Sequence, residues 1–168
     1  MNYSHLIVGF ILLLSACTSA NKFNEDAIRQ VQTFADERKA DAVITYFTHE
    51  NWRVRQQAAI AFASTHDSLG IEGLLNLSEF DKEPEVRAAA AFALGQYKMR
   101  GIVNLLLRRM KEESNEKVKH QLIIAIGKCG GLSELMTMLS DAGDILRNSL
   151  AEGVFYGIAQ GDTFSSSY

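Results

Sequence analysis

The side chains that could carry chemistry in this sequence are its histidines, its cysteines and its grouped carboxylates. The histidines are His5, His49, His66 and His120. They form no i, i+4 pair and lie beside no pair of cysteines, as a zinc site would require. The sequence also lacks a G-x-S-x-G motif, a phosphate-binding loop and a cysteine–histidine pair with an orienting partner. It therefore predicts no catalytic residue, no metal site, no cofactor and no small-molecule substrate, and we do not expect an enzyme.

The first residues, MNYSHLIVGFILLLSAC, read as an export signal. Leu6–Leu14 is apolar and uncharged, and the run is too short for a permanent membrane helix, which needs about 20 residues. The four residues Leu14-Ser15-Ala16-Cys17 resemble the lipobox of bacterial lipoproteins. That resemblance implies cleavage before Cys17 and lipid on its thiol and on the new N-terminus. The alternative is an ordinary signal that happens to be followed by a cysteine.

Small residues before a thiol suit this processing, because they let a peptidase approach and leave a nucleophile that can take a diacylglycerol. We therefore expect residues 1–16 to be a lipoprotein signal peptide and residues 17–23 to be a lipidated tether to the membrane. Thr18 follows the cysteine in place of aspartate, and by the same resemblance this favours the outer membrane over the inner one. The expected location is the cell envelope.

Cys129 has no intrachain partner if Cys17 is acylated. An unpaired thiol in an exported protein can be reactive or can pair between chains. It can also be a small buried residue, as cysteine often is. Because no basic neighbour except Lys128 is identifiable, the sequence favours the buried role.

Composition sets the class of the remaining chain. Of its 168 residues, 47% are hydrophobic, and the net charge is −3. The chain is too apolar to be disordered and too acidic to suggest a nucleic-acid partner.

A repeat spaces the helices that must position any site. The segments RVRQQAAIAFAS, EVRAAAAFALGQ and KVKHQLIIAIGK place Val54, Val86 and Val118 32 residues apart. Apolar residues within each copy fall at i, i+4, i+7 and i+8, which predicts a helix with a wide buried face. Leucine-rich stretches between the copies predict a second helix for each unit, and ILRNSLAEGVF is a weaker fourth copy. Asn51 and Asn115 are expected N-caps, and Pro84 is expected in a first helical turn.

The stretch VRAAAAFALG resembles the second helix of HEAT repeats, most closely the short HEAT-like kind of phycobilisome lyases. Its alanines would let neighbouring helices approach closely. The predicted fold is all-α: an α-solenoid of about four helix–turn–helix repeats over residues 39–159. Residues 24–38 form an additional N-terminal covering helix, and residues 160–168 form a C-terminal tail. A chromophore lyase would rest on fold analogy alone.

Residues 33–74 are similar to HEAT regions of exported bacterial proteins that can also carry a cyclophilin-type prolyl isomerase domain. Nothing after residue 130 reads as the strands of that domain, so the activity does not carry over. The resemblance implies a membrane-anchored protein–protein interaction scaffold with an unknown protein partner. The alternative is a non-catalytic fragment or relative of the isomerase proteins.

Two repeated columns are candidate sites. The basic column Arg55, Arg87, Lys119 and Arg147 is either a track for an anionic ligand or a ladder that ties adjacent repeats together. The sequence favours the ladder, with acidic or amide partners at Asn51, Asp81, Glu83 or Asn115.

The second column is Ile60, Phe92 and Ile124, which lies off the main apolar stripe. It is either a partner-binding strip on the concave surface or part of the core. At the C-terminal end we expect exposed apolar surface around Phe155 and Ile158, because no capping helix is readable after them.

Overall fold

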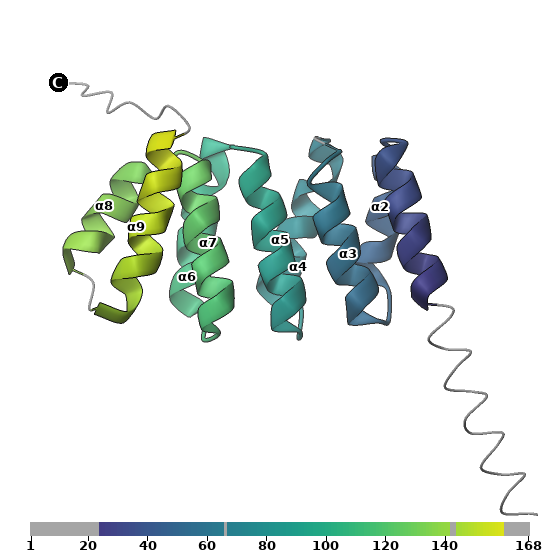
Figure 1. The fold of residues 1–168 in the computed structure, drawn as a ribbon, viewed down its shortest axis with the longest axis horizontal. Coiled ribbons are helices and arrows are strands. Elements are labelled where there is room, and N and C mark those ends of the chain that lie inside the picture. Colours follow the sequence, from purple (N-terminus) through teal and green to yellow (C-terminus); the bar gives the residue numbers. More distant parts are fainter. Residues whose placement is uncertain (1–23, 66, 142–143, 160–168) are drawn as a thin grey trace, which may run out of the picture.

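The computed structural model describes residues 24–65, 67–141 and 144–159, and all regular secondary structure within them is helical (Figure 1). Cys17, the expected lipid attachment site, lies outside the described residues. Every helix among them is too short or too polar to cross a membrane. The predicted all-α class is confirmed.

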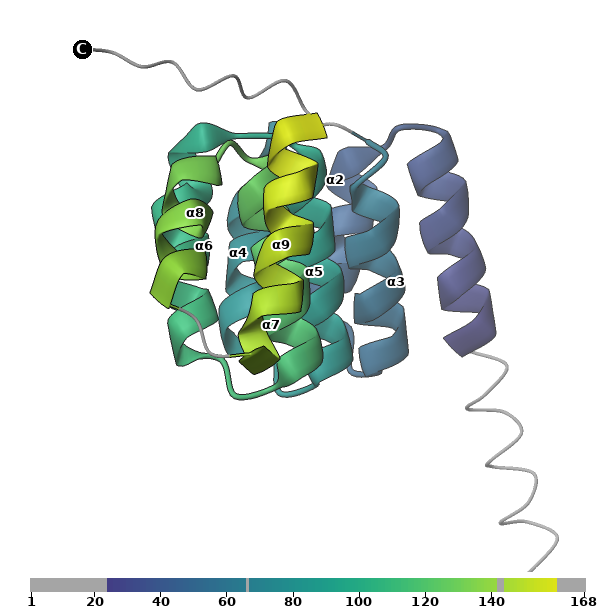
Figure 2. The same cartoon turned by 60° about the vertical axis from the view of Figure 1, so that its left-hand side comes forward.

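Four pairs of helices stand side by side in two layers (Figures 1 and 2). The back layer in Figure 1 contains α2 (Ala40–Ile44), α4 (Ile71–Phe80), α6 (Val103–Glu112) and α8 (Leu132–Asp141). The front layer contains α3 (Trp52–Phe62), α5 (Pro84–Gln96), α7 (Glu116–Lys128) and α9 (Asp144–Ala159). Short 3₁₀ helices follow α2 and precede α4 and α6, at Thr45–Thr48, Ser68–Gly70 and Arg100–Ile102.

A further helix, at residues 24–36, lies beside α3 at the N-terminal end of the stack (Figure 1). It buries Ala27, Val31 and Ala35 on one face, while its charged residues face solvent. The chain then turns at residues 37–38, where Arg38 has a left-handed φ of 56°. This helix covers the flank of the first repeat.

The front helices begin where the sequence places their caps. The Asn51 side chain accepts a hydrogen bond from the Arg53 N–H, and Asn115 accepts from the N–H groups of Lys117 and Val118. Pro84 is the first residue of α5, where its missing N–H costs no helical hydrogen bond. The predicted caps are confirmed at these three starts.

The core runs along the interface of the two layers. The valine column is fully buried, and so is the large column that follows it: Val54, Val86, Val118, Phe62, Leu94 and Ile126. Each such side chain stabilises the fold by about 1.5–3 kcal/mol. Between α3 and α7, Ala90, Ala91 and Ala93 of α5 are also fully buried. Small residues here let three front helices pack side by side and hold their outward surfaces in line.

Candidate functional site

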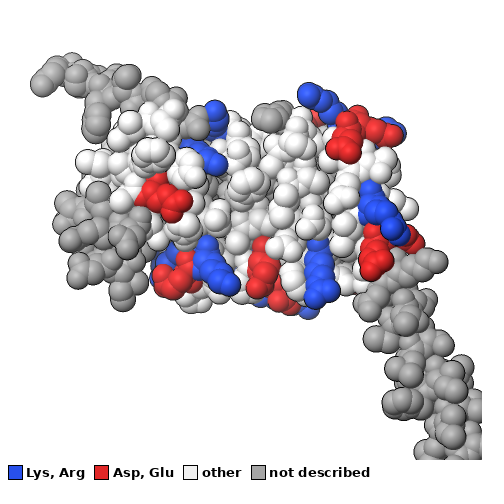
Figure 3. Space-filling model, in the orientation of Figure 1, with Lys and Arg blue, Asp and Glu red and all other residues white. Residues whose placement is uncertain are grey.

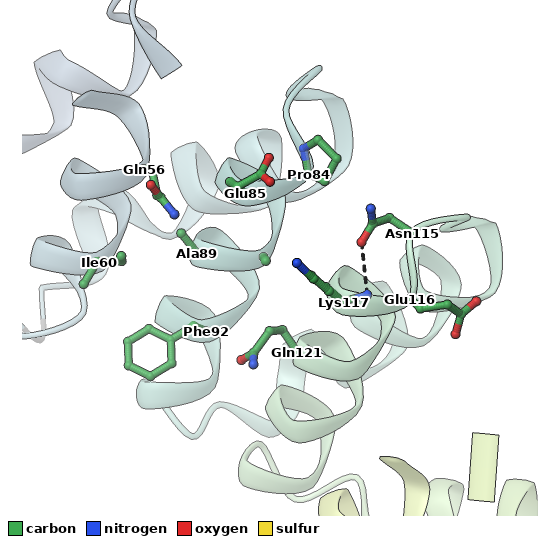
Figure 4. Close-up of a pocket in the computed structure, with 11 residues that line it drawn as sticks. Gln56, Ile60, Pro84, Glu85, Ala89, Phe92, Asn115, Glu116, Lys117 and Gln121 are labelled. Carbon is green, nitrogen blue, oxygen red and sulfur yellow. Dashed lines mark hydrogen bonds between the residues drawn. The ribbon is translucent and has the colours of Figure 1, made fainter. Parts of the chain in front are cut away.

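A groove of about 700 Å³ crosses the front layer (Figure 4). Its lining comes from α3, α5, α7 and the residue before α7: Gln56, Ile60, Pro84, Glu85, Ala88, Ala89, Phe92, Asn115, Glu116, Lys117 and Gln121. Most of the α5 lining is alanine, whose short side chain leaves the space open. The groove therefore exists because α5 is alanine-rich toward solvent as well as toward the core.

Two members of the predicted apolar strip lie in this groove. Ile60 and Phe92 are each 39% exposed, which is high for large apolar side chains in a packed helix layer. Ile124 is only 9% exposed and does not line the groove. The expected three-residue strip is therefore wrong in its third member.

Close packing of α9 on α7 accounts for the burial of Ile124. A Cβ on Gly127 would lie 2.0 Å from the carbonyl oxygen of Gly153, so the two backbones approach to a distance that only glycine permits. The equivalent contact between α5 and α7 is looser, because a Cβ on Gly95 would lie 3.0 Å from the Ala125 Cα. The groove closes on the side where α9 approaches α7.

Polar side chains border the apolar pair. Figure 4 shows Gln56, Lys117 and Gln121 extending into the groove from both sides, while the Phe92 ring lies at one end. Primary amides can both donate and accept hydrogen bonds, so they suit the backbone of a bound segment. The groove thus combines an apolar floor with groups that can pair with a peptide chain.

Charge is confined to the edges of this face. Figure 3 shows a broad uncharged band across the front layer, with charged side chains along its lower edge over the N-terminal ends of α3, α5 and α7. The column Arg53, Glu85 and Lys117 alternates in sign at 32-residue spacing. No single sign of charge dominates this edge.

The first basic residue joins two repeats. Nε and Nη2 of Arg55 on α3 donate to the two carboxylate oxygens of Asp81 at 2.7 and 2.9 Å. Nη1 donates to the carbonyl oxygens of His49 and Glu50, in the loop before α3, at 2.8 and 3.0 Å. Arg55 is 8% exposed, so the pair is nearly dry.

The second basic residue repeats this arrangement. Nε and Nη2 of Arg87 on α5 donate to Glu113 at 2.9 and 3.0 Å, and Nη1 donates to the carbonyl oxygen of Asp81 at 2.8 Å. Glu113 also accepts from the N–H groups of Ser114 and Asn115 and from Arg109. Arg109 in turn donates through Nε to the Ser78 carbonyl oxygen at 2.8 Å, which ties α6 to α4.

Both acids titrate below their ordinary range. Burial alone would raise the pKa of Asp81, but hydrogen bonds from Arg55 and the Glu83 N–H, with the charges of Arg55 and Arg87, hold that pKa below its usual value. Burial likewise opposes ionisation of Glu113, yet hydrogen bonds from Arg87 and the Asn115 N–H, with the charges of Arg109 and Arg87, lower its pKa. Both carboxylates are therefore ionised and fully engaged at neutral pH.

These paired units match a known family. The model described as HEAT repeats matches residues 71–154, which is half of the chain. The chain belongs to the HEAT-repeat family. A search of the curated proteins gives no significant match. HEAT repeats are typical of protein-interaction scaffolds, and an all-helical stack of this kind is typically non-catalytic.

Within the HEAT repeats, the ladder explains the first two members of the basic column. Arg55 and Arg87 are engaged inside the protein and do not form a track for an outside anion. Lys119 instead pairs with Glu116 of its own helix at an exposed site, and the side chain of Arg147 lies outside the described residues. Of the proposed ladder partners, Asp81 is confirmed.

Sequence reasoning missed Glu113. His49, Asp81 and Glu113 are 32 residues apart, and each accepts a hydrogen bond from the N–H two residues later in the loop. This acceptor column has the same period as the valines and was available as a signal.

The remaining reactive side chains serve packing or pairing. Cys129 is 2% exposed, its thiol lies 3.7 Å from the Leu94 carbonyl oxygen, and burial raises its pKa, which confirms the buried role. His120 Nε2 lies 2.6 Å from Glu152 and joins α7 to α9. His5 and His66 lie outside the described residues, within which no cluster of three or more His, Cys, Asp or Glu side chains could hold a metal ion.

Proposed function

We propose that this HEAT-repeat protein is a lipid-anchored scaffold that captures a segment of a partner protein in the groove across α3, α5 and α7. The groove is the observation that carries the proposal. It places two half-exposed apolar side chains, Ile60 and Phe92, beside primary amides on a rigid helical layer. Large apolar groups kept at a surface are typical of binding sites, because their burial by a partner stabilises the complex.

The groove suits a peptide segment better than a small molecule. It is open, it crosses three helices, and its polar groups lie along both sides of the apolar pair. Such a shape can follow an extended or helical chain, whereas small-molecule sites generally enclose most of their ligand.

The binding half of the proposal is tested by photo-crosslinking in cells. A photoreactive residue at position 121, inside the groove, should crosslink to a partner protein. Adding Phe92→Glu should reduce that crosslinked product about tenfold or more, because the carboxylate would be buried against apolar surface. Phe80→Glu is the matched control, since Phe80 is 70% exposed on α4 in the other layer. Equal crosslinking in the two variants would contradict binding in the groove.

The anchoring half rests on the resemblance of Leu14-Ser15-Ala16-Cys17 to a lipobox. Cys17→Ala should abolish metabolic labelling with a fatty acid and should release the protein from membranes or block its processing. Cys129→Ala is the control and should be labelled like the wild type. Labelling that survives Cys17→Ala would show that the anchor is elsewhere or absent.

A further inference from the structure

A lysine stands at the end of the groove, next to its apolar pair. Lys128 is the last residue of α7 and is half-buried. Its Nζ lies 5.7 Å from the ring centroid of Phe92 on α5 and 5.0 Å from that of Tyr156 on α9. The ammonium group is therefore held between two aromatic rings from the neighbouring front helices.

These rings position the charge without neutralising it. An ammonium within about 6 Å of a ring face is attracted to it, which restrains a side chain that is otherwise very mobile. The described residues offer Lys128 no carboxylate in ion-pair range. Glu152, one turn before Tyr156 on α9, is bound to His120 at 2.6 Å. Lys128 thus presents a localised positive charge at one end of an uncharged groove.

We propose that Lys128 recognises an acidic side chain of the captured segment. The inference rests on the function proposed above and specifies its partner: a segment with a large apolar residue on Ile60 and Phe92 and an Asp or Glu close to it. Charge complementarity selects this occupant, because a cation already held in place loses little entropy when it pairs with a carboxylate.

The distance from Lys128 to Phe92 limits the spacing of the two residues in the partner. Both must reach points only 5.7 Å apart. Side chains two residues apart project from the same face of an extended chain, about 7 Å apart, and those three or four apart are neighbours on a helix. The acid should therefore lie two to four residues from the apolar anchor.

Lys128 also has an ordinary reason to be where it is, since cations are favourable in the last turn of a helix. Lys111 provides a control for that effect. It lies in the last turn of α6, is exposed, and does not line the groove. Lys117 provides a second control, because it lies in the groove at the opposite end of α7.

The test is a selection of short random peptides displayed on phage against the folded wild-type protein and against Lys128→Gln. Peptides that bind the wild type but not Phe92→Glu are taken as groove binders. We expect them to be enriched in Asp or Glu two to four residues from a large apolar residue. Selection on Lys128→Gln should retain the apolar residue and lose the acid, whereas Lys111→Gln and Lys117→Gln should retain both.

A synthetic peptide from this selection then allows a double-mutant cycle by fluorescence anisotropy. Changing its acid to the amide, or Lys128 to Gln, should each weaken binding about five- to tenfold, and the two changes together should weaken it no further. Added salt should weaken binding of the acidic peptide more than that of the amide peptide.

The possible failures are distinguishable. Groove binders without an acidic preference, or additive losses in the cycle, would overturn the role of Lys128 and leave the proposed groove intact. A selection that yields no binder sensitive to Phe92→Glu would overturn both.

Discussion

Arg55 and Arg87 join front helices to the loop of the next repeat through buried ion pairs, whereas α9 is joined to α7 by close backbone contact and a partly exposed histidine–glutamate pair. The ladder fixes α3, α5 and α7 by directional hydrogen bonds near one end of each helix. The glycines let α9 pack tightly along α7 with no such pair.

This difference explains where the surface is open. Between ladder-joined helices, Ile60 and Phe92 remain 39% exposed, while Ile124 on the closely packed side is 9% exposed. At the far side of α9, apolar surface is exposed again, with Phe155 at 67% and Ile158 at 58%, as expected for the C-terminal end. A solenoid can thus offer or close a binding surface by changing how adjacent repeats are joined.

The strongest way to break the ladder is to remove one of its cations. Arg87→Met leaves Glu113 buried beside a lost partner, so we expect the free energy of unfolding to fall by about 3–5 kcal/mol. Lys119→Met, in the same column but paired at an exposed site, should cost less than about 0.5 kcal/mol. Urea denaturation followed by circular dichroism measures both. Similar losses for the two variants would show that the buried pair has no special weight.

The glycine junction can be broken by one methyl group. Gly127→Ala would place a Cβ 2.0 Å from the Gly153 carbonyl oxygen, so α9 must move away, at a cost of about 1–3 kcal/mol. Gly101→Ala is the control, because a Cβ there meets nothing within 4 Å. Hydrogen exchange should show faster exchange in α9 for Gly127→Ala alone. Unchanged protection of α9 would contradict the close contact.

Acid should weaken the ladder before it affects the glycine junction. The pKa values of Asp81 and Glu113 are lowered in the folded state, so both sites bind protons more weakly than in the unfolded chain. Their contribution is present above the ordinary carboxyl pKa of about 4 and is lost as pH falls through that value toward the folded pKa.

Stability measured by urea titration should therefore fall steeply below about pH 5 in the wild type. Glu113→Gln should be less stable at neutral pH and should show a shallower decline in acid. Glu112→Gln, an exposed neighbour on α6, should follow the wild-type profile. A Glu113→Gln profile parallel to that of the wild type would argue against ionisation of Glu113 as the cause.

The smallest effect is expected at the outer face of α9. Phe155→Ser should change the free energy of unfolding by less than about 0.5 kcal/mol, because the ring is already 67% exposed. Light scattering at rising concentration gives a second measurement, since removing exposed apolar surface should reduce any self-association. A loss above about 2 kcal/mol would mean that the ring is covered in solution.

Much of the fold could be predicted from the sequence because the repeat is a local property. The aligned valines at 32-residue spacing located the front helices, and Asn51, Pro84 and Asn115 marked three of their starts. Side-chain periodicity and capping depend on neighbours within a turn or two, and these are visible in one sequence.

The site was only half predictable. Ile60 and Phe92 followed from the column, but Ile124 did not behave like them, and Lys128 with Tyr156 was missed. Tyr156 follows Lys128 by 28 residues instead of 32, the same offset that places Arg147 after Lys119. A column extended at constant spacing therefore could not find it.

By itself, the sequence determined the helices, their pairing into repeats and the buried stripe, because each follows from periodicity within a unit. Only the tertiary structure decided which column is open to a partner. That depends on how closely adjacent front helices approach, which is set by contacts between residues far apart in the chain, such as Gly127 with Gly153 and Arg87 with Glu113. A repeat motif specifies the unit, but the distance between units is a property of the interface.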